Sequence, residues 1–484
     1  MRIFNELGTF WIPVYGEKIF CGILKEEDNL KEEDNGFYLK YLENSFLTFE
    51  EHKKLLNALN NSSNEQIKDQ FLILGEINGI QVTLFAFPSE NGFKISIIFK
   101  NIHLKNLNNI KFKEIILSIN TLNGFIRTKS ITDSSPEDRK NNPHNHSVNY
   151  KFQEFEKINL NRFELQLDPH CSFKNDFNLR EYNMSEEIKI KLKYSDKEDF
   201  LKIQEDLDLL KKFFTLIMGK SEIVEIKAKP CFTEIYTPDV EIYTPKLSQS
   251  VKTKNVTNNY KCFFQLEDVN NFDLLLKNWF DKHERLKPFY DLYFSTIFSN
   301  NYLEIDLLLY AQALETYYRK NKDSNNKYYN EEKYKDLEEH INTSIEDCYE
   351  KFDKFEINKD FKEKVKSSVK YSYQYSLRTI LKKLLDELDF PKINEILDNY
   401  SNKNNRKGKI KEFTDIVVNA RNYYTHYDKE LDNKSTLHLK KELKYIVEIC
   451  FMKELGLSDN EIKKITNNKH RFNVDHCNTI ISKI

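Results

Sequence analysis

The chain has 484 residues and a mass of 58.0 kDa, which is too long for one ordinary hydrophobic core, so two or three domains are expected. Its formal net charge of −2 excludes a protein that coats nucleic acid non-specifically and leaves room only for a local contact. No apolar run approaches the roughly 18 residues that span a bilayer, and the first residues lack a signal-peptide pattern. A cytoplasmic location without membrane contact is therefore expected.

Residues 1–194 show an apolar period near two, which predicts a β-rich region. Within Phe71–Phe99, Asn78-Gly79 and Asn91-Gly92 separate strand-like runs and are typical of hairpin turns. The other candidate strands are Gly8–Leu24, Gly36–Tyr41, Lys111–Ile119, Asn161–Leu167 and Glu187–Tyr194. A meander, a sandwich or a partly closed barrel would each fit, and the strand order stays open.

Residues 195–260 are expected to complete this N-terminal half with a helix, strands and a linker. Ser195 and Glu198 form a capping-box pattern, and apolar residues then repeat at three and four positions as far as Gly219, which predicts a helix. The segment Glu-Ile-Tyr-Thr-Pro occurs at 234–238 and again at 241–245. Two copies are too few for a solenoid, so we interpret them as extended segments before a polar linker.

Residues 261–484 show a helical pattern, which predicts an all-α bundle. The predicted helices cover 272–298, 302–319, 331–352, 361–388, 411–427, 436–455 and 461–465, and Gly456 is expected to end the sixth. The predicted fold class is thus α+β and multidomain, with a β-rich half followed by a helical one.

The helix at 411–427 ends in residues suited to chemistry. Phe413, Val417, Ala420 and Tyr424 recur at spacings of four, three and four, which predicts one buried face. Asn422 and His426 are four residues apart and share a face roughly opposite. Arg421 lies about 140° around the helix from His426. A site that uses both residues needs the helix end, the reach of the arginine, or a second copy of the helix.

Arg421 and His426 form an R-x4-H pattern, which also occurs at Arg139–His144 in a Pro-Asn loop and at Arg471–His476 in a polar tail. Only the Arg421 copy ends an amphipathic helix, so context selects it. This pattern resembles that of the HEPN ribonucleases. The segments AQALETYYR (311–319), YSLRTIL (375–381) and ARNYYTH (420–426) are similar to the HEPN domain of ApeA-type anti-phage abortive-infection proteins, which also follows a β-rich domain.

The resemblance implies a metal-independent endoribonuclease without cofactors, in which two HEPN domains pair and each contributes Arg421 and His426 to one cleft. It implies cleavage of tRNA or mRNA to a 2′,3′-cyclic phosphate, which stops host translation. Partners would be the RNA substrate, a second copy of the chain and a phage protein as trigger, and the N-terminal half (1–194) would act as the sensor or regulatory domain.

Further residues have a functional interpretation beside a structural one. Asn422 could orient the imidazole or hold a 2′-OH, or be a surface amide. Tyr423, Tyr424 and Tyr427 could stack on RNA bases, although Tyr424 fits the buried face better. Lys403, Arg406, Lys407 and Lys409 could contact phosphates or form a solvated loop. Glu315 and Arg378 could support the site or form rim salt bridges.

Two alternatives remain at this stage. The helical half could be a non-catalytic dimerisation and partner-binding module with the N-terminal half as a binding platform, or the chemistry could lie at Arg471 and His476. No metal site is expected, because the groups His144/His146 with His170/Cys171, and His470 with His476/Cys477, lack the paired spacing of zinc ligands. The seven cysteines contain no C-x-x-C pair and fit reduced thiols.

Overall fold

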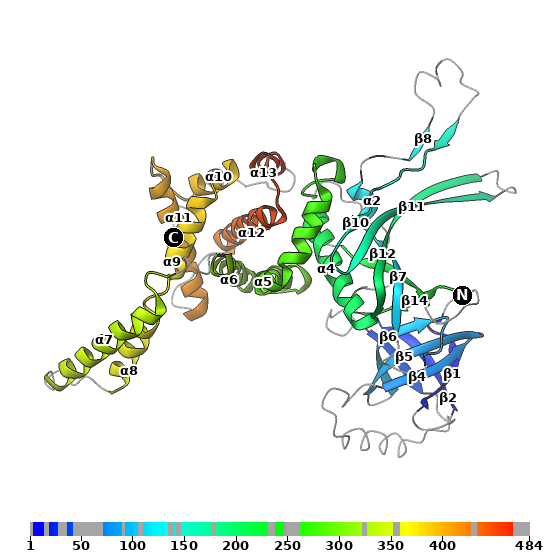
Figure 1. Ribbon diagram of the computed structural model, residues 1–484, viewed down its shortest axis with the longest axis horizontal. Coiled ribbons are helices and arrows are strands. Elements are labelled where there is room, and N and C mark those ends of the chain that lie inside the picture. Colours follow the sequence, from blue (N-terminus) through cyan, green and yellow to red (C-terminus); the bar gives the residue numbers. More distant parts are fainter. Residues whose placement is uncertain are drawn as a thin grey trace. The chain divides into compact units, whose positions relative to one another are not determined.

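A computed structural model describes most of the chain and divides it into two compact units, 1–273 and 274–484 (Figure 1). The described residues are 3–13, 19–27, 36–41, 71–89, 92–104, 110–126, 128, 130–133, 140, 147–176, 181–219, 221–230, 238–245, 247, 262–321, 327–351, 359–426 and 433–467. The first unit is β-rich and the second is helical, so the predicted α+β fold class is confirmed. No helix within these ranges is long and apolar enough to cross a membrane.

The first six strands form a closed antiparallel barrel. They are β1 (Leu7–Trp11), β2 (Ile19–Glu27), β3 (Gly36–Tyr41), β4 (Phe71–Ile77), β5 (Ile80–Ser89) and β6 (Gly92–Lys100). The order is β6-β3-β2-β1-β4-β5, and β5 also pairs with β6, which closes the ring. Of the three predicted arrangements, the barrel is present. The single strand expected at Gly8–Leu24 is instead the paired β1 and β2.

Backbone conformation agrees with the predicted hairpin turn between β4 and β5. Asn78 and Gly79 have φ values of 52° and 76°, the left-handed region that the turn requires. At the second predicted turn, Asn91 lies outside the described residues. Gly92 has a φ of 151°, and a Cβ there would overlap the carbonyl of Leu39 on the paired strand β3, so only glycine fits.

The barrel interior is filled by aromatic and branched side chains. Phe10 and Phe20 are buried, with ring centroids 5.9 Å apart. Gly75 of β4 lies against the Phe10 ring, where a Cβ would overlap the ring carbons. Because Gly75 has no side chain, the large Phe10 ring of the neighbouring strand fits into the barrel interior.

An open antiparallel sheet continues from β6. Its strands are β7 (Lys111–Ile119), β10 (Ile158–Asn159), β11 (Phe163–Asp176), β12 (Glu181–Asp199), β13 (Ile223–Pro230) and β14 (Val240–Tyr243). The order from the barrel outward is β6-β14-β13-β7-β12-β11-β10, so β6 belongs to both sheets. A short ribbon of β8 (Ile131–Asp133) and β9 (Val148–Tyr150) stands apart from this sheet. Strands were expected at 161–167 and 187–194, and both extend well beyond those limits. Of the two Glu-Ile-Tyr-Thr-Pro segments, the second begins with the last three residues of β14, and the first lies outside the described residues except for Pro238.

The predicted capping box at Ser195 and Glu198 is wrong. Both residues belong to β12, which continues past a bulge until Asp199 pairs with Lys111 of β7. Asp199 is the N-cap of α4 (Phe200–Met218), and its side chain accepts a hydrogen bond from the Leu201 N–H. Strand pairing thus overrides the local signal. The helix ends at Gly219 as expected, with φ 89°.

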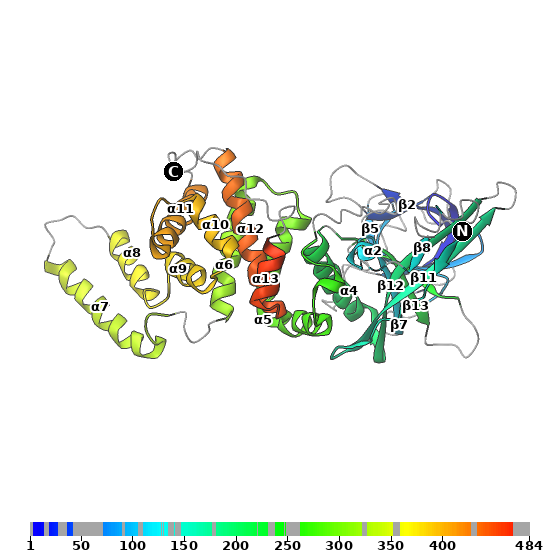
Figure 2. The ribbon, with the colours of Figure 1, turned by 90° about the horizontal axis from the view of Figure 1, so that it is seen from above.

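Short helical turns complete the first unit, and longer helices form the second (Figure 2). The short ones are α2 (Leu122–Phe125) and η5 (Leu266–Asp268). The longer ones are α5 (Phe272–Phe298), α6 (Leu303–Asn321), α7 (Glu331–Lys351), α8 (Lys359–Lys370), α9 (Leu377–Glu387), α10 (Pro391–Asn399), α11 (Arg406–His426), α12 (Asn433–Leu455) and α13 (Asp459–Thr466). One helix was expected at 361–388, but α8 and α9 divide it, and Ser376 caps the second. α10 was not predicted from the sequence.

Aromatic stacking and one carboxylate hold α5, α6 and α12 together. Phe451 of α12 stacks on Phe289 of α5 with centroids 4.2 Å apart. Glu454 accepts hydrogen bonds from the Tyr317 hydroxyl at 2.9 Å and the Asn321 amide at 2.6 Å, and pairs with Lys282 at 3.1 Å. Burial alone would raise the pKa of Glu454, but these donors hold the pKa below its ordinary value.

The close contact between Gly75 and the Phe10 ring predicts that one added methyl group at position 75 destabilises the barrel. Gly75→Ala should force the Phe10 ring aside and destabilise the barrel by about 1–3 kcal/mol. Glu76→Ala, on the exposed face of the same strand, is the control and should change little. Thermal unfolding of the full chain, followed by far-ultraviolet circular dichroism, measures both, and equal melting temperatures would contradict this packing.

Candidate functional site

One face of α11 is buried as the sequence predicts. Phe413, Val417, Ala420 and Tyr424 are at most 7% exposed, and α11 packs against α6 and α9 within the helical unit. Burial of large apolar side chains of this kind contributes roughly 1.5–3 kcal/mol each. This packing fixes the rotation of α11 about its axis and thereby decides which residues face outward.

Arg421 and Asn422 are both exposed near the end of α11. The Arg421 Nη1 donates a hydrogen bond to the Asn422 Oδ1 at 3.2 Å, and the Thr425 hydroxyl donates to the Arg421 carbonyl at 2.8 Å. The neighbouring amide therefore holds the guanidinium over the outward face. Its Nε and Nη2 donate no hydrogen bond among the described residues, which leaves donors for an oxyanion.

Arg421 differs from the other arginines that the structure describes. Six arginines lie in the described ranges, and five of them form an ion pair with a carboxylate. The five pairs are Arg162–Asp206, Arg285–Glu454, Arg319–Glu315, Arg378–Asp415 and Arg406–Asp386. Within the described ranges, the only side-chain partner of the Arg421 guanidinium is the neutral amide of Asn422. In a chain with 76 acidic residues, an exposed guanidinium without a carboxylate is suited to an external anion.

The end of α11 is tied to the next helix. The Tyr424 hydroxyl forms a hydrogen bond with the Thr436 hydroxyl of α12. His426 is the last residue of α11, so helical geometry holds as far as this position. Tyr427 lies outside the described residues. Tyr423 is half-buried and contacts the Tyr424 ring edge-on at 4.8 Å.

Arg378 reaches α11 from the start of α9. Its Nε lies 3.4 Å from the Asp415 Oδ1, an ion pair without hydrogen-bond geometry. Asp415 and Asn422 are seven residues apart, close to two helical turns, so they share a face of α11. Arg378 is thus a second cation on the face that carries Asn422, and its partner Asp415 was not among the residues predicted from the sequence.

The predicted basic run 403–409 divides into two kinds of residue. Arg406 donates to the carbonyls of Leu385 at 2.7 Å and Leu388 at 3.2 Å and thereby caps the end of α9. Lys409 pairs with Asp398 of α10. Lys403 is exposed and 3.6 Å from Glu412, and Lys407 is exposed. Of the four, Lys403 and Lys407 are the more accessible to an external phosphate.

Glu315 forms an ion pair with Arg319 at 2.8 Å, one turn further along α6. Arg319 also donates to the Tyr375 carbonyl at 2.9 Å. The two contacts of Arg319 connect α6 with the segment that precedes α9. Both Glu315 and Arg319 are far from α11 in the sequence.

The remaining R-x4-H copies cannot be placed. Arg139, His144, Arg471 and His476 all lie outside the described residues. Among the residues that are described, no group of three His, Cys, Asp or Glu side chains could hold a metal ion.

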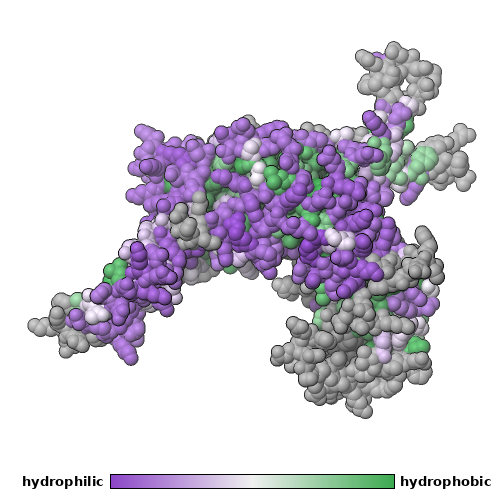
Figure 3. All heavy atoms as spheres, viewed as in Figure 1, coloured by the Kyte–Doolittle hydropathy of each residue, from purple (hydrophilic) through white to green (hydrophobic). Residues whose placement is uncertain are grey.

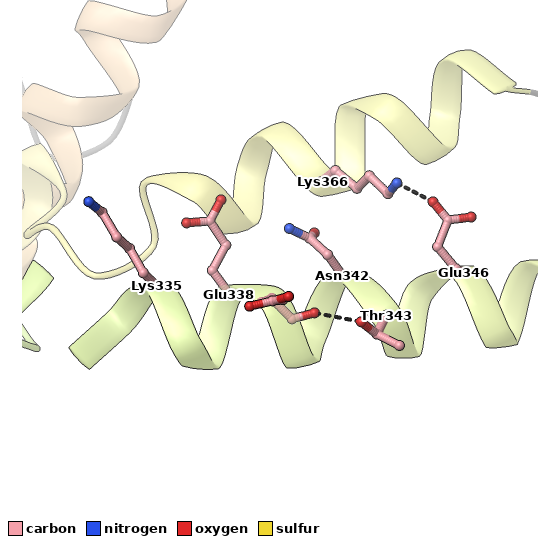
Figure 4. A pocket seen from close by; sticks show the side chains of 7 residues that line it. Lys335, Glu338, Asn342, Thr343, Glu346 and Lys366 are labelled. Atoms are coloured by element: carbon pink, nitrogen blue, oxygen red, sulfur yellow. Dashed lines mark hydrogen bonds and ion pairs between the residues drawn. The ribbon is translucent and has the colours of Figure 1, made fainter. Parts of the chain in front are cut away.

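A groove of about 390 Å³ lies between α7 and α8, and none of the candidate residues lines it (Figure 4). Its walls carry both charges: Lys335 and Glu338 stand on α7, and Lys366 of α8 pairs with Glu346 of α7. Figure 3 shows that the visible surface of the helical unit is mostly hydrophilic. Mixed charges that pair with each other suit a solvated helix contact better than a site for one anion.

A buried carboxyl lies on α12, beside residues of α10 and its C-terminal end. Glu442 of α12 is 4% exposed, and burial raises its pKa to about 8. Tyr400, Asn399 and the charge of Lys392 offset this only in part. Glu442 is therefore mostly protonated at neutral pH, and its raised pKa lowers the stability of the fold at pH values above the ordinary pKa of a glutamate.

Comparison with family models defines the class of the protein. A model described as Apea-like HEPN matches residues 308–461, a range that contains α11. The helical unit is therefore of the HEPN type. Domains of this class commonly bind RNA and form dimers, and the presence of a HEPN domain generally suggests a nuclease. No curated protein and no solved structure matches the chain.

A second model, described as ApeA N-terminal domain 1, matches residues 6–279, more than half of the chain. The chain belongs to the ApeA family, and it is a HEPN-type protein of anti-phage defence. The predicted resemblance is confirmed.

The raised pKa of Glu442 predicts a pH-dependent stability. Between about pH 5 and pH 8 the unfolded chain loses this proton while the folded chain keeps it, so the penalty grows by about 1.4 kcal/mol per pH unit and is constant above pH 8. Glu442→Gln should remove the penalty and be more stable than the unsubstituted chain at pH 8.5, but not at pH 5. Urea unfolding at both pH values measures this, with exposed Glu363→Gln as control. No gain at pH 8.5 would contradict a buried neutral carboxyl.

Proposed function

We propose that this ApeA-family chain is an endoribonuclease that cleaves tRNA or mRNA in the cytoplasm after a phage protein is detected, so that host translation stops. The observation that carries the proposal is the state of Arg421 at the end of a packed helix in the HEPN match. Arg421 is exposed, is oriented by Asn422 and has no carboxylate partner among the residues that the structure describes. A guanidinium in this state can bind the phosphate between two nucleotides.

RNA supplies its own nucleophile, since the 2′-OH can attack the adjacent phosphorus and leave a 2′,3′-cyclic phosphate and a 5′-OH. The reaction needs one group that takes the proton from the 2′-OH and one that gives a proton to the leaving 5′-oxygen. His426 is suited to this work because imidazole titrates near neutral pH. Arg421 would stabilise the charge on the phosphorane oxygens, and Asn422 would orient the ribose or the imidazole.

A second copy of the chain completes the proposed site. Arg421 and His426 lie about 140° apart around one helix, so a single α11 does not aim both at one phosphate. Two α11 helices related by a twofold axis would bring two arginines and two histidines together. Arg378, paired with Asp415 on the Asn422 face, would add charge along the same surface. Lys403 and Lys407 would contact phosphates further along the RNA, with Tyr427 stacking on a base.

The N-terminal unit would act as sensor and restraint. A ribonuclease that is always active would harm its own cell, so an inactive state must dominate until the trigger binds. The fusion of a barrel and open sheet to the HEPN unit in one chain supports this arrangement.

Replacement of the proposed catalytic residues tests the function. Arg421→Ala and His426→Ala should each lower RNA cleavage by at least about 100-fold, the typical contribution of a general acid–base group or a charge-stabilising donor. Protection against phage should be lost with it. Arg471→Ala and His476→Ala are the matched controls and should keep both activities. If folded Arg421→Ala and His426→Ala proteins still protect cells, the non-catalytic binding module is the better account.

Removal of residues 1–255 tests restraint by the N-terminal unit. The remaining chain should cleave RNA and slow growth without phage, whereas the full chain should do so only during infection. Growth curves and total-RNA profiles of uninfected cells give the comparison, and circular dichroism confirms that the shortened chain is helical. Equal basal toxicity of the two chains would contradict the proposed restraint.

A further inference from the structure

Two short, paired connections in the helical unit carry five tyrosines. Residues 327–330 connect to α7 and residues 371–376 connect α8 to α9. They pair as a small β-bridge, in which the Tyr328 N–H donates to the Tyr373 carbonyl at 2.7 Å. We call the resulting group the tyrosine junction, and its members are Tyr328, Tyr329, Tyr371, Tyr373 and Tyr375.

One part of the junction is structural. Tyr373 is buried and packs on Tyr334 of α7 with centroids 5.1 Å apart. The Tyr334 hydroxyl donates to the Val369 carbonyl of α8. These contacts hold the base of the α7–α8 hairpin, which extends from the rest of the helical unit (Figures 1 and 2).

The other part of the junction consists of tyrosines whose rings are largely exposed to solvent. Tyr328, Tyr329 and Tyr371 are 60%, 49% and 59% exposed. The Tyr328 hydroxyl forms a hydrogen bond of 2.6 Å with Thr379 in the first turn of α9, and its ring meets Tyr375 edge-on at 4.6 Å. Its position is thus fixed while much of its surface faces solvent. An exposed ring held in place is a surface on which a flat group can stack at little entropic cost.

Lysines stand over the junction. Lys370 lies 5.6 Å from the centre of the Tyr371 ring, and Lys383 lies 4.9 Å from that of Tyr375. Neither lysine forms an ion pair with a carboxylate of the described residues. Exposed rings beside unpaired cations match the two needs of single-stranded nucleic acid, a stacking surface for bases and positive charge for phosphates. A duplex hides the faces of its bases and does not use such a surface.

We propose that the tyrosine junction binds an unstacked, single-stranded segment of the RNA substrate. Bases would stack on Tyr328 and Tyr371, and Lys370 and Lys383 would contact the phosphates. The junction adjoins the α11 face through the first turn of α9, where Thr379 bonds Tyr328 and the preceding residue Arg378 pairs with Asp415. The proposal rests on the proposed function, in which RNA is the substrate. In this role, the junction would select single-stranded RNA over paired RNA.

The test measures RNA binding separately from cleavage. Full-length protein with Arg421→Ala, which is expected not to cut RNA, is titrated into a fluorescein-labelled single-stranded RNA and into a duplex of the same sequence, with anisotropy as the readout. Tyr328→Ala combined with Tyr371→Ala should weaken single-strand binding about ten-fold or more. The corresponding pair of Phe substitutions should keep most of the affinity, because the rings remain for stacking and only the Tyr328 hydroxyl bond to Thr379 is lost.

Tyr302→Ala is the matched control, since Tyr302 is an 82% exposed tyrosine between α5 and α6, and it should leave the affinity unchanged. The proposal is overturned if the double Ala variant binds single strands as tightly as the parent, if the Phe pair loses as much as the Ala pair, or if the parent binds duplex equally well or binds no RNA. Loss of phage protection with unchanged RNA affinity would also overturn it and would indicate a protein partner at the junction.

The outcome is independent of the catalytic proposal. Unaltered cleavage in Arg421→Ala and His426→Ala proteins would refute the proposed active site, yet a tyrosine-dependent affinity for single strands would still support the junction.

Discussion

The burial of one face of α11 is the constraint on which the candidate site depends. Phe413, Val417, Ala420 and Tyr424 pack into the helical unit and leave α11 a single orientation about its axis. The exposed contact between Arg421 and Asn422 is too weak to orient a helix, whereas the apolar face contributes several times more. The core therefore positions the polar residues, and the bond between Tyr424 and Thr436 extends that control to the end of the helix.

The charge distribution limits the proposed attraction to RNA to local surfaces. The net charge of −2 gives no general affinity for phosphate, and most described arginines are neutralised within the fold. Arg406 shows how a basic residue near the site is used structurally, since it caps the carbonyls of α9. Among the described residues, Arg421 on α11 and the two lysines of the tyrosine junction, Lys370 and Lys383, have no carboxylate partner, and Lys407 is exposed. For the proposed ribonuclease, which would stay inactive until a trigger binds, weak affinity for RNA outside one surface would be an advantage.

Local signals in the sequence predicted the elements whose partners are close in the chain. The Asn78-Gly79 turn and the buried face of α11 depend on neighbouring residues, and both are present. Predictions were wrong where distant pairing decides the structure. Ser195 reads as a helix cap but lies in β12, because that strand continues along β7 to Lys111. The 361–388 helix is broken at Lys-Tyr-Ser-Tyr-Gln-Tyr, because Gln374 pairs with Lys327. The ion pair of Arg378 could not be predicted from the sequence either, because its partner Asp415 lies on another helix.

The central claim is that the exposed face of α11 cuts RNA through the ribose 2′-OH, which a single modified nucleotide tests most directly. An RNA cleaved by the triggered full-length protein is compared with the same RNA carrying one 2′-deoxy residue on the 5′ side of the cut. The account predicts that the unmodified RNA gives a 2′,3′-cyclic phosphate and that the modified bond stays intact. Cleavage of both RNAs at the same rate would contradict it.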